Sequence, residues 1–121
     1  MARVLGVITL PGCACQVAMA RRFVATTLGD RPQADTAVLL TSEAVTNSVI
    51  HTASATVTVV VIETPAGLRL EIIDDGADTV PAGYAGCDLR EGKRGVFLVE
   101  VFSVRSGFYA DECGLTYWFE L

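Results

Sequence analysis

The chain has 121 residues, of which 51% are hydrophobic, and a mean hydropathy of +0.46; this fits one domain over residues 1–121 and argues against intrinsic disorder. Nine Lys and Arg residues against 14 Asp and Glu residues give a formal charge of −5 without a basic block, which argues against a nucleic-acid surface. No apolar run is long enough to span a bilayer, so we expect a cytoplasmic protein that binds a small ligand or a protein partner.

The first half of the chain predicts a strand and two helices. Apolar residues over Arg3–Leu10 predict the strand. Apolar residues at helical spacing predict a helix over residues 14–28, which Gly29–Pro32 would end. A second helix is expected over residues 35–51, with Asp35 as its N-terminal cap.

A β-hairpin is expected next. Residues Ala55–Thr64 are rich in Val, Ile and Thr and predict a strand. Thr64–Gly67 predicts a turn, and Leu68–Asp74 predicts the returning strand. Residues 76–92 lack periodicity and predict a long loop, a kind of segment that is often a lid or a binding element.

The last part of the chain predicts a helix and a second hairpin. Lys93–Phe102 is apolar on nearly all sides, which is typical of a buried helix. Val104–Tyr109 and Leu115–Leu121 predict two strands. The order of elements lacks strict alternation of strands and helices, so it favours an α+β, two-layer sandwich: a mostly antiparallel, mixed sheet with helices on one face.

The four cysteines leave several possibilities open. Cys13, Cys15, Cys87 and Cys113 could form two disulfides or ligate a metal ion. We expect free thiols, because the cytoplasm is reducing. The N-terminus also has some features of a lipoprotein signal that ends at Cys13, although Pro11 fits poorly beside a cleavage site.

The second predicted helix carries a carboxylate and an amide on one side. Glu43 and Asn47 are four residues apart, so they face the same way. Leu39, Leu40 and Ile50 fall on that side, which places the two polar groups within an apolar patch. Magnesium favours oxygen ligands and takes one or two from a protein, so this pair indicates a magnesium site. An ordinary exposed helix flank is the alternative.

The strand that ends at Asp74 suggests a second polar group of the site. Leu68, Leu70, Ile72 and Asp74 share one strand face by the period of two. A carboxylate on this apolar face could accept a hydrogen bond from an exocyclic amine such as that of adenine. Gly76 would allow the ligand to approach the backbone. The alternative is an Asp that begins a turn.

A glycine-containing segment precedes the last predicted helix. Gly92, Lys93, Arg94 and Gly95 lie where free N–H groups at a helix start can bind phosphate. Lys93 or Arg94 could add positive charge. A flexible loop with a glycine hinge is the alternative interpretation.

Three motifs, taken in order, resemble the N, G1 and G2 boxes of the GHKL ATPase superfamily, which includes DNA gyrase, heat-shock chaperone ATPases and histidine kinases. They are Glu43-x-x-x-Asn47, Asp74-x-Gly76 and Gly92-x-x-Gly95. The closer resemblance is to small bacterial anti-sigma regulatory serine/threonine kinases. The segments that carry it are Ala20–Val24, Leu39–Asn47, Arg94–Glu100 and Gly114–Leu121.

This resemblance implies a histidine kinase-like ATPase fold with ATP and Mg²⁺ as cofactors. It implies a homodimeric kinase that phosphorylates an anti-anti-sigma partner of the STAS type on Ser or Thr and sequesters a sigma factor, with Arg21 and Arg22 as candidate partner contacts. The implied site consists of Glu43 as general base, Asn47 as magnesium ligand, Asp74 as acceptor for the adenine amine with Thr116 nearby through water, and Gly76, Gly92, Lys93 and Gly95 around the nucleotide.

Two positions depart from the family pattern. Asp78 stands near the place of a second glycine in the G1 box, and Lys93 stands where the G2 box often has glycine. These changes reduce lid flexibility or add charge beside the phosphates. The alternative function is therefore a module of the same fold that binds nucleotide or partner with weak or no catalysis. The catalytic lobe of a sensor histidine kinase is disfavoured, since no phosphoacceptor helix precedes the boxes.

Overall fold

The computed structural model describes residues 1–52, 55–74, 105–111 and 114–121. Its α-helices are α1 (Val17–Leu28) and α2 (Ala34–Thr52), and a short 3-10 turn, η1 (Ala14–Gln16), precedes α1. Its strands are β1 (Arg3–Pro11), β2 (Thr56–Thr64), β3 (Gly67–Asp74), β4 (Arg105–Asp111) and β5 (Gly114–Glu120). Within these ranges, none of the helices has the length and apolar character needed to cross a membrane.

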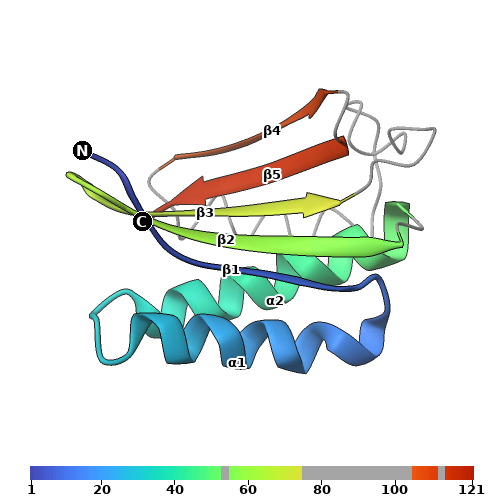
Figure 1. The fold of residues 1–121 in the computed structure, drawn as a ribbon, viewed down its shortest axis with the longest axis horizontal. Coiled ribbons are helices and arrows are strands. Elements are labelled where there is room, and N and C mark those ends of the chain that lie inside the picture. Colours follow the sequence, from blue (N-terminus) through green and yellow to red (C-terminus); the bar gives the residue numbers. More distant parts are fainter. Residues whose placement is uncertain (53–54, 75–104, 112–113) are drawn as a thin grey trace.

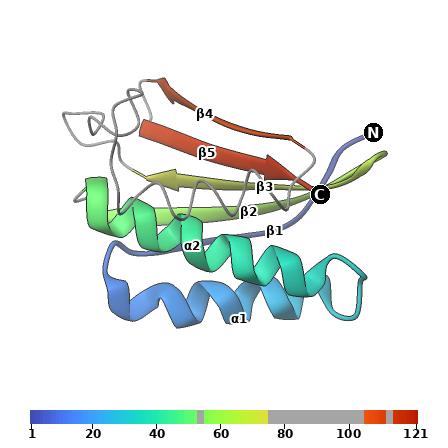
Figure 2. The ribbon, with the colours of Figure 1, turned by 180° about the vertical axis from the view of Figure 1, so that it is seen from behind.

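The elements form two layers, with α1 and α2 side by side on one face of the sheet (Figure 1, Figure 2). The sheet has five strands in the order β1-β2-β3-β5-β4, and every neighbouring pair is antiparallel. The α+β class and the placement of helices on one face are confirmed. The expectation of a mixed sheet is wrong for the described part of the chain, where the strand pairs are antiparallel throughout.

The pair of helices explains why β2 runs against β1. From the end of β1, α1 runs back along the sheet and α2 returns to the end where β1 finished (Figure 1). The next strand therefore runs in the opposite direction to β1, whereas a single crossover helix would produce a parallel pair. The resulting register pairs Val7 with Val60 and Leu10 with Val57.

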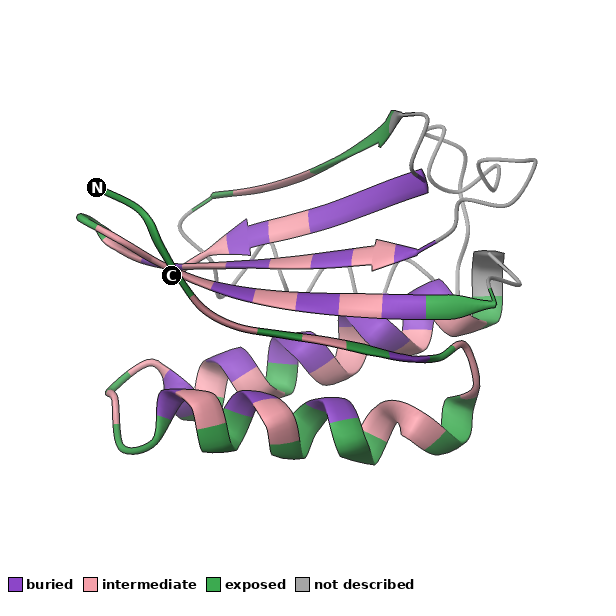
Figure 3. Cartoon of the chain, in the orientation of Figure 1, coloured by how far each residue is buried: buried purple, intermediate pink, exposed green. Residues whose placement is uncertain are grey.

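One face of the central strands β2 and β3 lies in the core (Figure 3). On β2 and β3 the buried residues are every second one, as the period of a strand requires. α1 contributes residues four apart, and α2 contributes a row that includes several alanines, which allow a close approach to the sheet. The central core residues are Val57, Val59, Val61, Leu68, Leu70, Ile72 and Phe119 from the strands, and Ala20, Val24, Leu28, Ala37, Leu40, Ala44 and Val45 from the helices.

The element boundaries lie close to the predicted ones, with two differences at the helices. The first predicted helix divides into η1 and α1. α2 begins at Ala34, so Asp35 lies in its first turn instead of capping it; a carboxylate there still interacts favourably with the helix N-terminus. Gly29 ends α1 with φ of 61°, a left-handed conformation that glycine adopts without steric cost.

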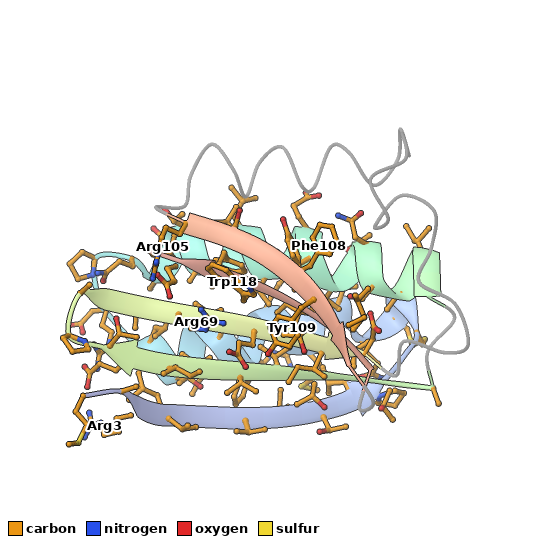
Figure 4. All side chains as sticks on the ribbon, turned by 90° about the horizontal axis from the view of Figure 1, so that it is seen from above. Arg3, Arg69, Arg105, Phe108, Tyr109 and Trp118 are labelled. Atoms are coloured by element: carbon orange, nitrogen blue, oxygen red, sulfur yellow. A yellow bond between two sulfur atoms is a disulfide. The ribbon has the colours of Figure 1, made fainter. Side chains whose placement is uncertain are left out.

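The sheet face opposite the helices carries a cluster of charged residues around Trp118 (Figure 4). Arg69 donates from Nε to Glu71 at 2.9 Å and from Nη1 to Glu120 at 3.0 Å. Arg105 donates from Nε and Nη2 to the other oxygen of Glu120, at 2.9 and 2.6 Å. The Arg69 guanidinium also lies 4.3 Å from the centroid of the Trp118 ring. These contacts join β3, β5 and β4 across this face.

The two arginines lower the pKa of the Glu120 carboxyl group. Partial burial acts to raise this pKa, but the hydrogen bonds and charges of Arg105 and Arg69 together exceed that effect. A carboxyl group with a lowered pKa in the folded state stabilises the fold above its unfolded pKa. That stabilisation is lost as the pH falls through the folded pKa.

The buried face of the sheet predicts a difference between two identical substitutions. Val59 is 0% exposed, whereas Val7 on the neighbouring strand is 55% exposed on the opposite face. We expect Val59→Ala to lower the free energy of unfolding by about 2 to 3 kcal/mol, because it removes two buried methyl groups and leaves a cavity. Val7→Ala should cost less than about 1 kcal/mol. Urea unfolding measures both, and equal losses would contradict this arrangement of the sheet.

The charged cluster predicts a pH-dependent effect of Glu120→Gln. The variant should be less stable than the wild type at pH 7, and the difference should shrink as the pH falls below the unfolded glutamate pKa of about 4.3. Urea unfolding at a series of pH values measures this difference. The stability difference between the two proteins should also shrink in roughly 1 M salt, because part of the ion-pair interaction is exposed and therefore screened. A difference that grows toward acid would show that the arginines do not hold this carboxylate.

Candidate functional site

The sequence-predicted polar groups on α2 and β3 lie toward one end of the two-layer structure. α2 packs against β3. The C-terminal end of α2 and the C-terminal end of β3 point to the same side of the molecule (Figure 1). Asn47 lies near that end of α2, and Asp74 is the last residue of β3. The fold therefore brings the helix and the strand that carry these two residues together.

Asn47 and Asp74 are both buried, with exposed fractions of 5% and 3%. Both take part in interactions within the chain, so neither is an orphaned polar group. Asp74 pairs with Val57 on one side and Leu115 on the other, and these two residues are buried as well. The Asp74 side chain thus projects from the core face of the sheet, as the strand period predicted. A carboxylate in apolar surroundings selects strongly for hydrogen-bond donors, because an unmatched partner costs free energy.

Glu43 lies one helical turn before Asn47 and is half-buried. The expectation of a uniformly apolar patch around this pair is wrong. Leu40 is fully buried, but Leu39 and Ile50 are 44% and 59% exposed. The reason is that α2 turns one side toward the sheet and another away from it, and Glu43 lies toward the boundary between them. Glu43 is thus reachable from solvent, whereas Asn47 is enclosed.

The residues present are chemically suited to a magnesium ion. Asn47 offers an amide oxygen and Glu43 a carboxylate from the adjacent turn, and magnesium uses such oxygens together with water and phosphate. Among the described residues, no group of three or more His, Cys, Asp and Glu side chains forms a metal cage. An ion held there would accordingly need ligands from water or from a bound phosphate.

Thr116 does not lie beside Asp74. In the register of β3 and β5, Asp74 pairs with Leu115, while Thr116 pairs with Ile73. Neighbouring residues on a strand point to opposite faces, so the Thr116 side chain leaves the sheet on the side away from the helices. The register thus places the Thr116 side chain on the face opposite Asp74, and an approach of Thr116 to adenine through water stays a prediction from the sequence. Leu115 takes the position opposite Asp74, and a leucine offers no hydrogen bond.

The remaining predicted site residues lie outside the described residues. These are Gly76, Gly92, Lys93 and Gly95, together with Asp78, the loop over 76–92 and the helix over Lys93–Phe102. Their roles stay predictions from the sequence.

The expectation of free thiols is wrong for two of the four cysteines. Cys13 and Cys15 are joined by a disulfide in the turn between β1 and α1. The turn brings their Cα atoms to 5.3 Å, within the range of about 4.4 to 6.8 Å that a disulfide can bridge. Cys87 and Cys113 lie outside the described residues.

The predicted strand at Arg3–Leu10 is confirmed as β1.

Sequence reasoning missed two buried hydroxyl groups on α2. Ser48 is 1% exposed and follows Asn47 directly. Thr41 is 0% exposed, and its Oγ1 has no hydrogen-bond partner among the residues that the structure describes. Thr46 differs, because its Oγ1 donates to the carbonyl oxygen of Ser42 at 2.7 Å. Thr41 and Ser48 lie three and four residues from the buried Ala44, on the same side of α2. The helical wheel does not say which side of a helix meets the sheet, so their burial could not be predicted from it alone.

The difference between these two threonines predicts opposite effects of the same substitution. Thr41→Val replaces an unsatisfied buried hydroxyl with a methyl group of similar size. We expect it to raise the free energy of unfolding by about 1 kcal/mol, because the desolvation cost of the hydroxyl disappears. Thr46→Val loses a hydrogen bond and should be neutral or destabilising. Urea unfolding of both variants tests this, and destabilisation by Thr41→Val would mean that its hydroxyl has a partner.

Comparison with known proteins does not assign a family to the chain. A scan against protein-family models finds none that matches, and a search of curated proteins finds no match.

Proposed function

We propose that this chain binds ATP with Mg²⁺ in a histidine kinase-like ATPase fold and acts as a regulatory serine/threonine kinase of the anti-sigma type. The observation that carries the proposal is the burial of Asn47 and Asp74 on two packed elements, α2 and β3, at the end of the sheet. These are the residues that the sequence resemblance assigns to magnesium and to adenine.

Each residue has a distinct role in this proposal. Asp74 accepts a hydrogen bond from the exocyclic amine of adenine, and its apolar neighbours exclude bases that lack a donor at that position. The side-chain oxygen of Asn47 holds the magnesium ion, which supplies charge neutralisation at the phosphates. Glu43, half-buried and reachable from solvent, accepts the proton of the attacking hydroxyl. Gly76, Gly92, Lys93 and Gly95 surround the phosphates.

The proposed partners follow from the same resemblance. The phosphate acceptor is a Ser or Thr on an anti-anti-sigma protein of the STAS type, and the second partner is a sigma factor that the chain sequesters in the cytoplasm as a homodimer. Arg21 and Arg22 are exposed on α1. They offer positive charge on the outer side of the helix layer, where a partner can reach them.

A second candidate function is a nucleotide-binding or partner-binding module with weak or no catalysis. Asp78 and Lys93, which stand near positions of glycine in the resembling family, favour it. A negative or positive side chain in a segment that has to close over phosphates would hinder turnover more than binding. The two functions therefore differ at the transfer step.

Calorimetric titration with ATP, with and without Mg²⁺, tests the proposed site. Asn47→Ala should remove the enhancement by magnesium while retaining metal-independent binding. Asp74→Asn should weaken binding at least about tenfold under both conditions, because a charge-assisted hydrogen bond is lost. Thr116→Val tests the predicted contact of Thr116: this residue is as buried as Asp74 but its side chain lies on the opposite face, so the register predicts unchanged affinity. Absence of binding by a folded wild-type chain at millimolar ATP would overturn the proposal.

Phosphoryl transfer from labelled ATP to a STAS-type protein separates the two candidate functions. Glu43→Gln should keep nucleotide affinity within about twofold and lower the rate of transfer at least about 100-fold, as loss of a general base does. A wild-type chain that binds Mg-ATP but transfers no phosphate to any STAS-type partner of the same organism would favour the binding module. Thermal melting of every variant confirms that it is folded.

A further inference from the structure

The disulfide between Cys13 and Cys15 has no role in the proposed nucleotide site. It lies in the turn Gly12–Gln16, which connects β1 to α1 at the right-hand end of the molecule in Figure 1. The backbone hydrogen bonds of the turn include one to Ala55, which directly precedes β2, and others to residues within or next to the turn. This disulfide therefore needs an explanation of its own.

A structural role explains this disulfide poorly. A disulfide stabilises a fold mainly by closing a loop in the unfolded chain, and the gain grows with the length of that loop. Cys13 and Cys15 are two residues apart, so the loop is among the shortest possible. The backbone of the turn is also held without the sulfur atoms: Gly12 N–H donates to Ala55 at 2.9 Å, and Gln16 N–H donates to the Cys13 carbonyl at 2.9 Å.

The sulfur atoms are open to approach by another thiol. Cys15 is exposed and Cys13 is half-buried. The neighbouring residues in the turn are Gly12 and Ala14, so the adjoining side chains are small. Thiol–disulfide exchange requires access of a thiolate to one sulfur along the disulfide axis, and exposed disulfides are the labile ones.

The two sulfur atoms differ in a way that gives the exchange a direction. The N–H of Cys15 donates to Sγ of Cys13 at 3.3 Å, and Nε2 of Gln16 lies 3.9 Å from Sγ of Cys15. The backbone donor is the shorter contact and stabilises negative charge on the Cys13 sulfur. A better-stabilised thiolate is the better leaving group in exchange. The exposed Cys15 sulfur is thus the one attacked, and Cys13 is the one released.

We propose that Cys13 and Cys15 form a thiol–disulfide exchange site for low-molecular-weight thiols of the glutathione class. The thiolate of the small molecule attacks Sγ of Cys15; the Cys13–Cys15 bond breaks, and Cys13 leaves as a thiolate. A second small thiolate then attacks the small-molecule sulfur of this mixed disulfide, which forms the small-molecule disulfide and releases Cys15 as a thiolate. Two electrons pass from the small thiols to the protein, which yields two cysteine thiols and one small-molecule disulfide. The site is independent of the nucleotide proposal.

Tryptic mapping after equilibration in glutathione redox buffers tests the proposal on the wild-type chain. Cleavage after Arg3 and Arg21 gives a peptide that contains Cys13 and Cys15 but neither Cys87 nor Cys113. After an acid quench and alkylation, this peptide should change from unlabelled to doubly labelled as reduced glutathione increases. The melting temperature of the folded chain should shift by less than about 5 °C between the two states, as a very short loop implies.

Cys13→Ser is the matched variant for the order of steps. With oxidised glutathione it should accumulate a glutathione adduct on Cys15, because the thiol that would displace glutathione is missing. The reduced wild type should form the intramolecular disulfide instead and hold at least about tenfold less adduct. The proposal is overturned if the wild-type peptide is doubly labelled in every buffer, if the disulfide resists reduction until the chain unfolds, or if both proteins accumulate the same adduct.

Discussion

The closed apolar interface between the sheet and the helix pair is the constraint on which the rest of the structure depends. α1 and α2 return the chain to the end of the sheet where β1 finished, which fixes the antiparallel pairing of β2 with β1. Small residues on α2, Ala37 and Ala44, are completely buried and let this helix lie close to the sheet. Close packing of this kind leaves few positions for a polar side chain, because an unpaired polar group inside it costs free energy.

Apart from Thr41, the polar groups described above lie near the end of the two layers or on the outward face of the sheet. Asn47 and Asp74 lie near the end of α2 and at the end of β3, where the apolar pairing of the layers stops. The charged residues Arg69, Glu71 and Glu120 lie on the other face, where their ion pairs are partly exposed. Partly exposed pairs stabilise a fold modestly. Their position matters more for the surface: they give the open face of the sheet a fixed pattern of both charges around Trp118.

Periodicity explains why much of this fold could be predicted from the sequence. The alternation of Leu68, Leu70, Ile72 and Asp74 predicted correctly which face of β3 lies in the core, since a strand has a strict period of two. The same rule distinguishes Thr116 from Leu115: the two residues are one position apart, and a shift by one residue changes the face. The exposure of Leu39 and Ile50 could not be predicted, because a helical wheel gives relative directions but not which side meets the sheet. The Cys13–Cys15 pair lay beyond sequence reasoning, since the spacing alone does not specify the geometry of the turn.

The disulfide turn and the candidate nucleotide site both involve contacts of α2, although their chemistry is independent. η1 packs against both α1 and α2, and Gly12 is hydrogen-bonded to Ala55, which directly precedes β2. The turn thus contacts α2 itself and, through Ala55, the residue just before β2. α2 is the helix that carries Glu43 and Asn47. Cleavage of the Cys13–Cys15 bond leaves the backbone hydrogen bonds of the turn in place but removes the covalent limit on the separation of the two cysteines. The register of the sheet is set by its own hydrogen bonds and apolar faces, so it does not depend on the disulfide.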